Sequence, residues 1–245
     1  MSNAVFTEQV YRDLPMLAVE WLPEAVIPQH GYMTTSRYGD LDTRIDAILP
    51  DLVGWCTPEK GKRIARLVRD ANTRLCVELG VFGGRSLVAL ALGVAQNGFG
   101  HVHGIDPFTK SAAVEGTNAK HDDAWWAEID YEDVRRQAIH VVETNGLAPY
   151  VTFVREKSMD VVDRYENGSI DVLHQDSNHS AEVSTAEVLA WMPKLRLGAF
   201  WIFDDIDWPT TRPAQQLLLQ NGFHCVETYA QWALFQSVGG TLKGC

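Results

Sequence analysis

Two runs of β-branched and aromatic residues end in acidic side chains, at residues 170–179 (IDVLHQDSNH) and at residues 200–205 (FWIFDD). Each run has the length and the residue types of a buried strand. The segment between them, residues 180–195, carries apolar residues at mostly helical spacing, and Gly198 follows as a stop signal. Two parallel strands joined by a helix end at the same edge of a sheet, so the sequence predicts that the acidic ends lie close together.

The same alternation of strands and helices continues on both sides of this unit. We expect strands at residues 75–79, 102–105, 151–154, 170–174, 200–203, 225–229 and 232–235, and helices at residues 85–95, 131–143, 159–165, 180–195 and 214–220. The last two strands are joined too tightly for a crossover helix, so they must form an antiparallel hairpin. The expected fold class is α/β, with a Rossmann-like, doubly wound, seven-stranded sheet that ends in an antiparallel hairpin.

Two segments depart from this alternation and define the expected domain organisation. Residues 1–72 begin as a proline-containing arm without sustained periodicity and continue into two helices, one over residues 41–53 and one from Pro58, and we interpret them as an N-terminal helical and extended lid or interface. Residues 73–245 form the sheet domain. Within it, residues 107–130 are polar, contain aromatic residues and are too long for an ordinary connection, which indicates a functional lid.

The composition restricts the class of partner. The 245 residues suit one α/β domain with extensions, and their formal net charge of -11, without a basic stripe, argues against a nucleic-acid partner. No apolar run approaches the roughly 20 residues of a membrane span, and no secretory signal begins the sequence. The four cysteines show no CxxC pairing, which favours reduced thiols in the cytoplasm over a zinc site. A small molecule is therefore the expected partner.

A glycine-rich loop joins the first strand of the sheet domain to its helix, at residues 77–86 (VELGVFGGRS). Its glycines permit a tight turn and a close approach of the backbone to a ligand, although it is neither a GxGxxG nor a GxxxxGK[ST] motif. Asp106 closes the next strand, where a carboxylate can accept hydrogen bonds from both ribose hydroxyls. The sequence thus predicts a nucleoside site; NAD and S-adenosylmethionine (SAM) both carry such a ribose, and a plain β-to-α turn is the alternative.

The order of these motifs resembles class I SAM-dependent methyltransferases, and more narrowly their metal-dependent O-methyltransferases, such as the catechol and macrolide-sugar enzymes. The resemblance covers about residues 75–235. It implies that Glu78 and Gly80 line the methionine moiety, that Ser86 binds its carboxylate, that Asp106 binds the ribose and that Ser158 contacts the adenine edge. A helix N-cap is the alternative role for Ser158, and an exposed helix position is the alternative for Ser86.

The resemblance also places metal ligands at Asp176, Asp204 and Asp205. Independently, three carboxylates without an accompanying cysteine suit Mg²⁺, Mn²⁺ or Ca²⁺, and their mutual repulsion calls for a cation. The third ligand of the family is often Asn, so one of the paired acids at residues 204 and 205 could instead support a ligand. Solvated loop acids are the alternative to a metal site.

His179 is a candidate general base because it follows Asp176 by three positions. In the resemblance the catechol enzymes carry a Lys at this offset and the macrolide-sugar enzymes a His, and an imidazole titrates near neutral pH. A capping or exposed histidine at a helix start is the alternative. His174, inside the strand, is expected to be a core residue.

The resulting expectation is a Mg²⁺- and SAM-dependent O-methyltransferase of the cytoplasm that modifies a small hydroxylated molecule, such as a natural product. Trp125, Trp126 and Trp208 flank the expected site and could wall a substrate pocket or form a subunit interface in a homo-oligomer. Three alternatives stay open: a metal-independent methyltransferase, a SAM-fold accessory protein without transferase activity, as in relatives of the cephamycin-biosynthesis type, and an NAD-dependent oxidoreductase, which the missing third glycine disfavours. The acceptor stays open among aromatic diols, sugar hydroxyls and polyketide hydroxyls.

Overall fold

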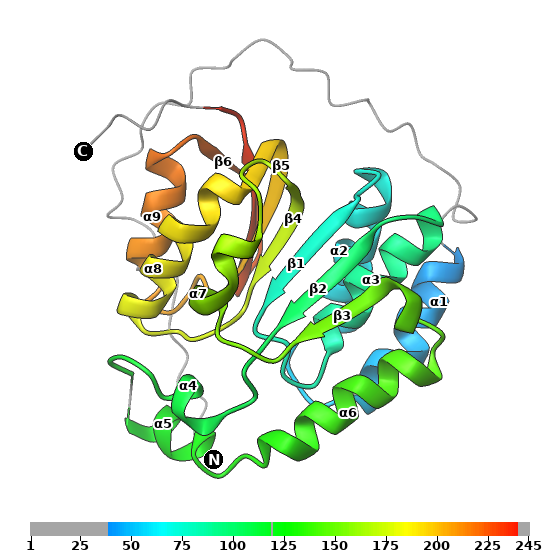
Figure 1. Cartoon of the computed structure of the whole chain (residues 1–245), viewed down its shortest axis with the longest axis horizontal. Coiled ribbons are helices and arrows are strands. Elements are labelled where there is room, and N and C mark those ends of the chain that lie inside the picture. The colour runs from blue at the N-terminus through cyan, green and yellow to red at the C-terminus, as the bar shows by residue number, and fades with distance from the viewer. Residues whose placement is uncertain (1–38, 119, 240–245) are drawn as a thin grey trace. The chain divides into compact units, whose positions relative to one another are not determined.

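The structure is a computed structural model that describes residues 39–118 and 120–239. The arm predicted for the start of the chain, up to residue 38, and Cys245 lie outside the described residues. Seven strands form one sheet in the order β3-β2-β1-β4-β5-β7-β6 (Figure 1). Their bounds are β1 (Leu75–Leu79), β2 (His101–Ile105), β3 (Val151–Val154), β4 (Ile170–Gln175), β5 (Leu195–Asp204), β6 (Phe223–Thr228) and β7 (Trp232–Ser237).

The strand directions confirm the predicted fold class. The pairings β1–β2, β1–β4, β2–β3 and β4–β5 are all parallel, and β7 runs antiparallel to both β5 and β6. The chain leaves β1 towards β2 and β3 on one side and returns to β4 on the other side. Ligands of open α/β sheets bind at such a reversal of strand order, beyond the carboxyl ends of the strands.

Helices cover both faces of the sheet (Figure 1). On one face lie α1 (Gly39–Ile48), α2 (Pro58–Asp70), α3 (Arg85–Asn97) and α6 (Tyr131–Thr144), and on the other lie α7 (Ser158–Val161), α8 (Ala181–Trp191) and α9 (Arg212–Gln220). The predicted lid holds two short helices, α4 (Lys110–Ala113) and α5 (Lys120–Trp126), at one end of the sheet. Short 3₁₀ turns are η3 (Leu49–Asp51), η4 (Ala148–Tyr150), η5 (Val162–Arg164) and η6 (Met192–Lys194).

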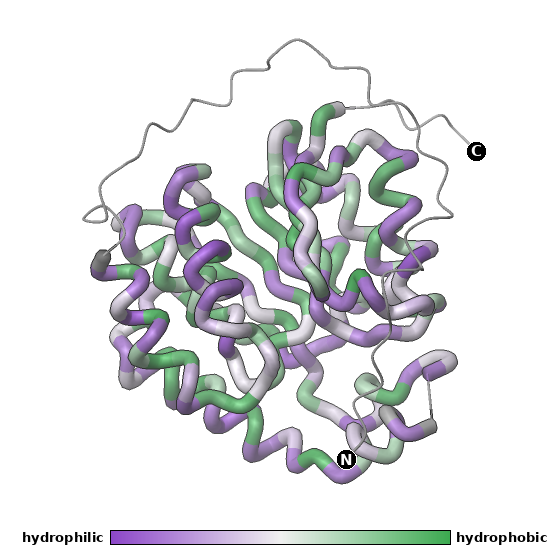
Figure 2. The backbone as a smooth tube through the Cα atoms, turned by 180° about the vertical axis from the view of Figure 1, so that it is seen from behind, coloured by the Kyte–Doolittle hydropathy of each residue, from purple (hydrophilic) through white to green (hydrophobic). Residues whose placement is uncertain are grey.

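The alternation of side chains along β1 divides the core into two layers. Cys76 joins the hydrophobic cluster beneath α2 and α3, whereas Val77 and Leu79 join the cluster beneath α8 and α9. Hydrophobic segments recur along the strands, and the flanking helices alternate between hydrophobic and hydrophilic segments (Figure 2). Glu78, which shares the face of Cys76, therefore points to the α2 and α3 side.

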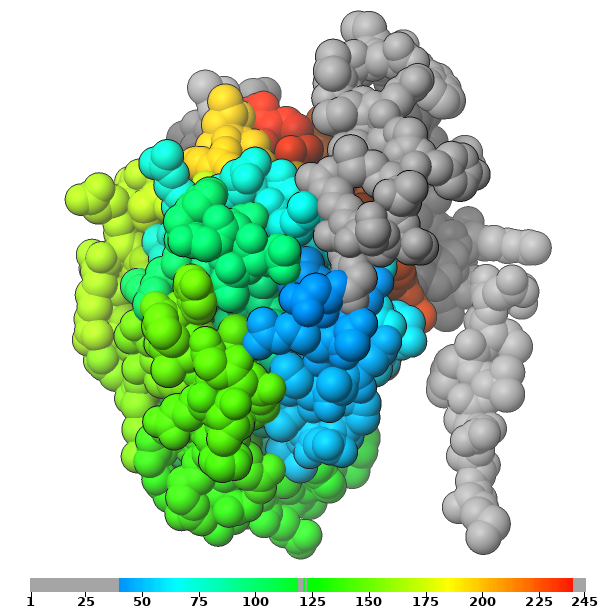
Figure 3. Space-filling model, turned by 90° about the vertical axis from the view of Figure 1, so that its right-hand side faces the viewer, coloured from blue at the N-terminus to red at the C-terminus, as the bar shows by residue number. Residues whose placement is uncertain are grey.

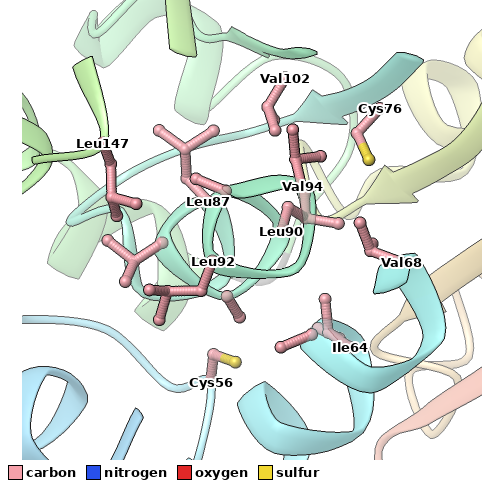
Figure 4. Packing of buried hydrophobic residues seen from close by; sticks show 14 of the residues in the cluster. Cys56, Ile64, Val68, Cys76, Leu87, Leu90, Leu92, Val94, Val102 and Leu147 are labelled. Atoms are coloured by element: carbon pink, nitrogen blue, oxygen red, sulfur yellow. The ribbon is translucent and has the colours of Figure 1, made fainter. Parts of the chain in front are cut away.

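Helix α2 is held close to α3 and the sheet. Its start follows the predicted pattern, because the Thr57 hydroxyl accepts a hydrogen bond from the backbone N–H of Lys60 at 3.2 Å. A Cβ atom at Gly93 of α3 would lie 2.7 Å from the carbonyl oxygen of Ala65 and from Cβ of Val68, so only glycine permits this approach. Figure 4 shows hydrophobic side chains of α2 and α3 packed in the same cluster. The expected division at residue 72 groups α1 and α2 with the arm, and in the structure both helices pack into the core of the sheet.

Helix α1 contacts the end of α6. The Arg44 guanidinium donates a hydrogen bond of 2.9 Å to the carbonyl oxygen of Asn145, just after α6, and the two helices lie side by side on the face seen in Figure 3.

Among the described residues, no helix is long and apolar enough to cross a membrane.

The end of α8 and the start of β5 differ from the prediction. The helix expected over residues 180–195 ends at Trp191, because Pro193 lacks an N–H and forces the chain into η6. Strand β5 then begins at Leu195, well before the expected start at residue 200. Gly198 does not stop the helix; it lies inside β5 with φ of 80°, in a segment where the register with β4 is interrupted.

Candidate active site

The loops after β1 and β4 touch at the switch point of the sheet. The N–H of Gly80 donates to the carbonyl oxygen of Ile105 at 2.9 Å, and the residue has φ of 85°. A Cβ atom there would overlap the carbonyl oxygen of Asp176 and would lie 2.8 Å from Cα of Ser177. Only glycine fits, so the predicted glycine loop brings the acidic end of β4 against the loop that follows β1.

Asp106 organises the glycine loop from the end of β2. Its carboxylate accepts hydrogen bonds from the backbone N–H groups of Val81, Phe82 and Phe108, at 2.9, 3.0 and 2.6 Å. Burial raises the pKa of Asp106 above its ordinary value, and these three N–H groups oppose that shift. Oδ2 accepts the bonds from Val81 and Phe82, and Oδ1 accepts only the bond from Phe108, so Oδ1 keeps a lone pair with which Asp106 can still accept a hydrogen bond from a ligand.

Two cavities open beyond the carboxyl ends of the strands. The first, of about 600 Å³, is lined by Asp106, Ser158, Met159 and Glu187, and we call it the Asp106 pocket. The second, of about 540 Å³, is lined by Trp55, Lys60, Asp204, Asp205, Trp208 and Trp232, and we call it the Lys60 pocket. Both pockets share Gly80, Phe82, Trp126, Asp176, Ser177 and His179. The two cavities therefore meet at the acidic end of β4.

A buried row of charged and polar groups leads from β1 to the Lys60 pocket. Oε1 of Glu78 lies within hydrogen-bond distance of Nδ1 of His174, at 2.9 Å, and Nε2 of His174 lies 3.6 Å from Oδ2 of Asp204. The ammonium of Lys60, from α2, forms an ion pair with Asp204, and only 7% of the Lys60 side chain is exposed. Burial would raise the pKa of Asp204, but Lys60 and His174 outweigh it and hold that pKa well below its ordinary value.

Asp176 has a different electrostatic environment. Burial, followed by the negative charge of Asp204, raises the pKa of Asp176 well above its ordinary value, and the attraction of Lys60 only partly offsets this. The ionised form of Asp176 therefore lacks sufficient positive charge nearby.

His179 lies directly over Asp205. Its Nε2 atom is 2.5 Å from Oδ2 of Asp205, and its ring centroid lies 6.4 Å from the ring of Trp126 and 4.5 Å from that of Trp208. The backbone of Asp205 has φ of 53°, in the left-handed region that few non-glycine residues adopt. The Thr211 hydroxyl donates to the carbonyl oxygen of Asp205 at 2.7 Å and holds this turn. Strain of this kind concentrates at functional sites.

The acids and histidines form two overlapping groups with the spacing of metal ligands. Among the described residues, one group contains His174, Asp176 and Asp204, and the other contains Asp176, His179 and Asp205; the ligand atoms of each group lie within 4.8 Å of one another. Asp176 is common to both. Because the carboxylate of Asp176 needs a positive charge and oxygen ligands predominate, these residues fit a hard divalent cation.

Two of the residues predicted to bind the methionine moiety lie away from the Asp106 pocket. Glu78 is fully buried, contacts His174 and lines neither pocket. Ser86 lies in the first turn of α3 and lines the Lys60 pocket. Gly80, Asp106 and Ser158, by contrast, all line the Asp106 pocket.

Sequence reasoning did not find Lys60 or Glu187. Glu187 is 1% exposed and its carboxylate accepts hydrogen bonds from Ser158 and Ser177; burial raises its pKa, and these donors oppose the shift. The sequence nevertheless contains a signal for Lys60 and for Glu187, namely their spacing from buried helix residues. Lys60 precedes the buried Ile64 by one helical turn, and Glu187 precedes the buried Trp191 in the same way, so both lie on core-facing stripes.

A family model described as a methyltransferase domain matches residues 77–206. The chain belongs to this methyltransferase family. The matched segment of the methyltransferase runs from β1 to just beyond β5, so it contains the glycine loop, Asp106 and the three acids at the ends of β4 and β5. No curated protein matches the sequence significantly.

Solved structures share the fold of this methyltransferase. NovP, an O-methyltransferase, superposes with a TM-score of 0.64 at 16% identity, over 84% of this chain and 100% of NovP. TomG, an O-methyltransferase from Streptomyces achromogenes in complex with SAM, superposes with a TM-score of 0.55 at 17% identity, over 84% of this chain and 100% of TomG. An O-methyltransferase from Bacillus cereus in complex with SAH (S-adenosylhomocysteine) superposes with a TM-score of 0.55 at 18% identity, over 88% of this chain and 94% of the Bacillus cereus enzyme.

Proposed function

We propose that this methyltransferase transfers the methyl group of SAM to a hydroxyl of a small molecule, with the help of a divalent cation, Mg²⁺ first among the candidates. The observation that carries the proposal is the meeting of two cavities at Asp176 and His179. In this arrangement the Asp106 pocket holds SAM and the Lys60 pocket holds the acceptor. The similar proteins TomG and the Bacillus cereus enzyme, which bind SAM and SAH, support the assignment of the nucleoside.

The residues at the boundary of the pockets would hold the cation. Asp176 and Asp205, with Asp204, offer carboxylate oxygens, and because burial beside Asp204 raises the pKa of Asp176, a cation there would favour its ionised form. When bound, the cation would supply Lewis acidity, which lowers the pKa of an acceptor hydroxyl. Lys60 fixes the orientation of Asp204 through their ion pair.

His179 would accept the proton of the acceptor. Nε2 of His179 lies 2.5 Å from Oδ2 of Asp205, so the tautomer with its hydrogen on Nε2 would present the lone pair of Nδ1 to the proton of the acceptor. The acceptor hydroxyl then loses its proton to Nδ1, its oxygen bonds to the methyl carbon, and the sulfur keeps the electron pair of the broken bond. Trp126 and Trp208, beside His179, hold the imidazole in place and line the acceptor side.

Transfer of radiolabelled methyl from SAM to a panel of aromatic diols, sugars and polyketide alcohols tests the proposed function. We expect product only with acceptors that carry a hydroxyl, loss of turnover in EDTA, and recovery when Mg²⁺ or Mn²⁺ is added. Undiminished turnover in chelator would favour a metal-independent transferase, in which Lys60 supplies the positive charge beside Asp204. SAM binding without turnover on any acceptor would favour an accessory protein.

A further inference from the structure

Glu187 is a buried carboxylate at the wall of the Asp106 pocket, and the mechanism above does not use it. It lies on α8, and its two oxygens accept three hydrogen bonds: from Oγ of Ser158 at 2.5 Å, from Oγ of Ser177 at 2.5 Å, and from the side-chain amide of Gln175 at 2.9 Å. The three donors are two hydroxyls and an amide. A buried carboxylate held by three donors acts only as an acceptor, since an ionised carboxylate has no hydrogen to donate.

This arrangement fixes the direction of both serine hydroxyls. A hydroxyl has one hydrogen and two lone pairs, so a serine that donates to Glu187 can offer only lone pairs to any other partner. Ser158 begins α7, after the carboxyl end of β3, and Ser177 follows β4; both line the Asp106 pocket. The part of the pocket between these two strand ends therefore presents hydrogen-bond acceptors to a ligand.

Such a wall distinguishes two kinds of purine. A 6-amino purine, such as adenine, presents a donor at position 6, which the serine oxygens can accept. A 6-oxo purine, such as hypoxanthine, presents an acceptor there and would face lone pairs without a hydrogen between them. Sites that leave a buried polar group unpaired with the wrong ligand discriminate strongly against it.

We propose that Glu187 is a positioning residue that orients the hydroxyls of Ser158 and Ser177 as acceptors and so makes the Asp106 pocket select a 6-amino purine over a 6-oxo purine. The inference rests on the proposed function, because it assumes that the base of SAM lies between these serines. Glu187 acts through the serines and is assigned no part in methyl transfer.

Binding of two product analogues tests the proposal by calorimetry. S-adenosylhomocysteine carries the 6-amino group, and S-inosylhomocysteine differs by the 6-oxo group. We expect the wild type to prefer the adenosyl compound by at least about tenfold, on the scale of one unpaired buried polar group. Glu187→Gln should reduce this preference to about threefold or less. The Gln amide can donate a hydrogen bond to the oxygen of one serine, and the hydroxyl hydrogen of that serine can then turn towards the 6-oxo group.

The control is Glu182→Gln, which removes a carboxylate from the same pocket and the same helix without touching either serine. It should keep the wild-type preference. If Glu187→Gln fails to fold, as judged by its melting curve, Ser158→Ala replaces it and should weaken binding of the adenosyl compound more than that of the inosyl compound.

An unchanged preference in a folded Glu187→Gln variant, or in Ser158→Ala, would overturn the assignment of Glu187. A wild type that binds the two analogues equally well would overturn it as well. Absence of binding of S-adenosylhomocysteine to the wild type would instead contradict the proposed function itself, so the two failures are distinguishable.

Discussion

At the scale of single residues, the buried ion pair of Lys60 and Asp204 sets the charge of the site. Asp204 keeps its negative charge because Lys60 lies against it, whereas burial and the charge of Asp204 raise the pKa of Asp176. Lys60 also lies over the ring of Trp232, at 5.7 Å from the ring centroid, in cation–π geometry. One lysine from α2 thus connects the N-terminal helices to the end of β5.

Replacement of Lys60 by Met should therefore destabilise the protein. The change leaves the carboxylate of Asp204 buried without its cation, and loss of one partner of a buried pair costs about 3–5 kcal/mol. Urea unfolding at neutral pH measures the effect. Lys62→Met is the matched control, since Lys62 lies on the same helix and its pair with Asp46 is more exposed, with a contribution of at most about 1 kcal/mol. Equal stability of the two variants would contradict the role given to Lys60.

His179→Ala tests whether the imidazole takes the proton of the acceptor. Loss of a general base lowers the chemical step by about 10²–10⁴-fold, and the ascending limb of the pH–rate profile should disappear. Single-turnover methyl transfer as a function of pH measures both effects. Affinity for SAM and for Mn²⁺ should stay within a few-fold of the wild type. A parallel loss of Mn²⁺ affinity would show that His179 is a metal ligand instead.

At the scale of elements, Asp171 connects β4 with β1 and β5 near the amino ends of these strands, opposite the site. Its carboxylate accepts the backbone N–H groups of Arg74 and Leu75 at 2.8 and 2.9 Å and pairs with Arg196 of β5. Burial raises the pKa of Asp171, but Arg196 and the two N–H groups outweigh burial and hold the pKa below its ordinary value.

The sign of this shift predicts how stability depends on pH. A carboxyl whose folded pKa lies below its unfolded value of about 3.9 adds stability above that pH, and this stability disappears as the pH falls through the folded pKa. The wild type should therefore be more stable than Asp171→Asn at pH 6, and the difference should shrink below about pH 4. Urea midpoints across this range measure it, with the exposed Asp163→Asn as control. A difference that does not change with pH would contradict the linkage.

Most elements were predictable because their patterns are local. The cap of Thr57 with Pro58, the apolar run of residues 75–79 and the tight connection between the last two strands each specify their element within a few residues. The end of α8 was misjudged because Gly198 was given more weight than Pro193, which breaks the helix outright.

The site was only partly predictable because its remaining contacts join distant segments. Asp176, Asp204 and His179 follow strand ends, where the topology brings them together. Lys60 comes from a helix outside that pattern, and the pairing of Glu78 with His174 depends on strand register. A lysine or glutamate on a core-facing stripe is the sequence signal to look for in such cases.

At the scale of the whole molecule, two pockets meet at one set of shared residues. The Asp106 pocket lies beyond the carboxyl ends of β1, β2 and β3, and residues of α2, β5 and β7 line the Lys60 pocket; both pockets reach Asp176 and His179. Methyl transfer needs the methyl carbon of the donor and the oxygen of the acceptor in direct contact and within reach of one base, which two cavities that meet at these residues allow. The central claim is that the Asp106 pocket is the nucleoside side.

Calorimetric titration of S-adenosylhomocysteine tests this claim most directly, with wild type, Asp106→Ala and Trp208→Ala compared under the same conditions. We predict binding to the wild type, a loss of about 1–3 kcal/mol in Asp106→Ala from the lost hydrogen bonding to the ribose, and wild-type affinity in Trp208→Ala, because Trp208 lines the Lys60 pocket and not the Asp106 pocket. Folded variants with the reverse pattern, affinity lost in Trp208→Ala and retained in Asp106→Ala, would contradict the assignment of the two pockets.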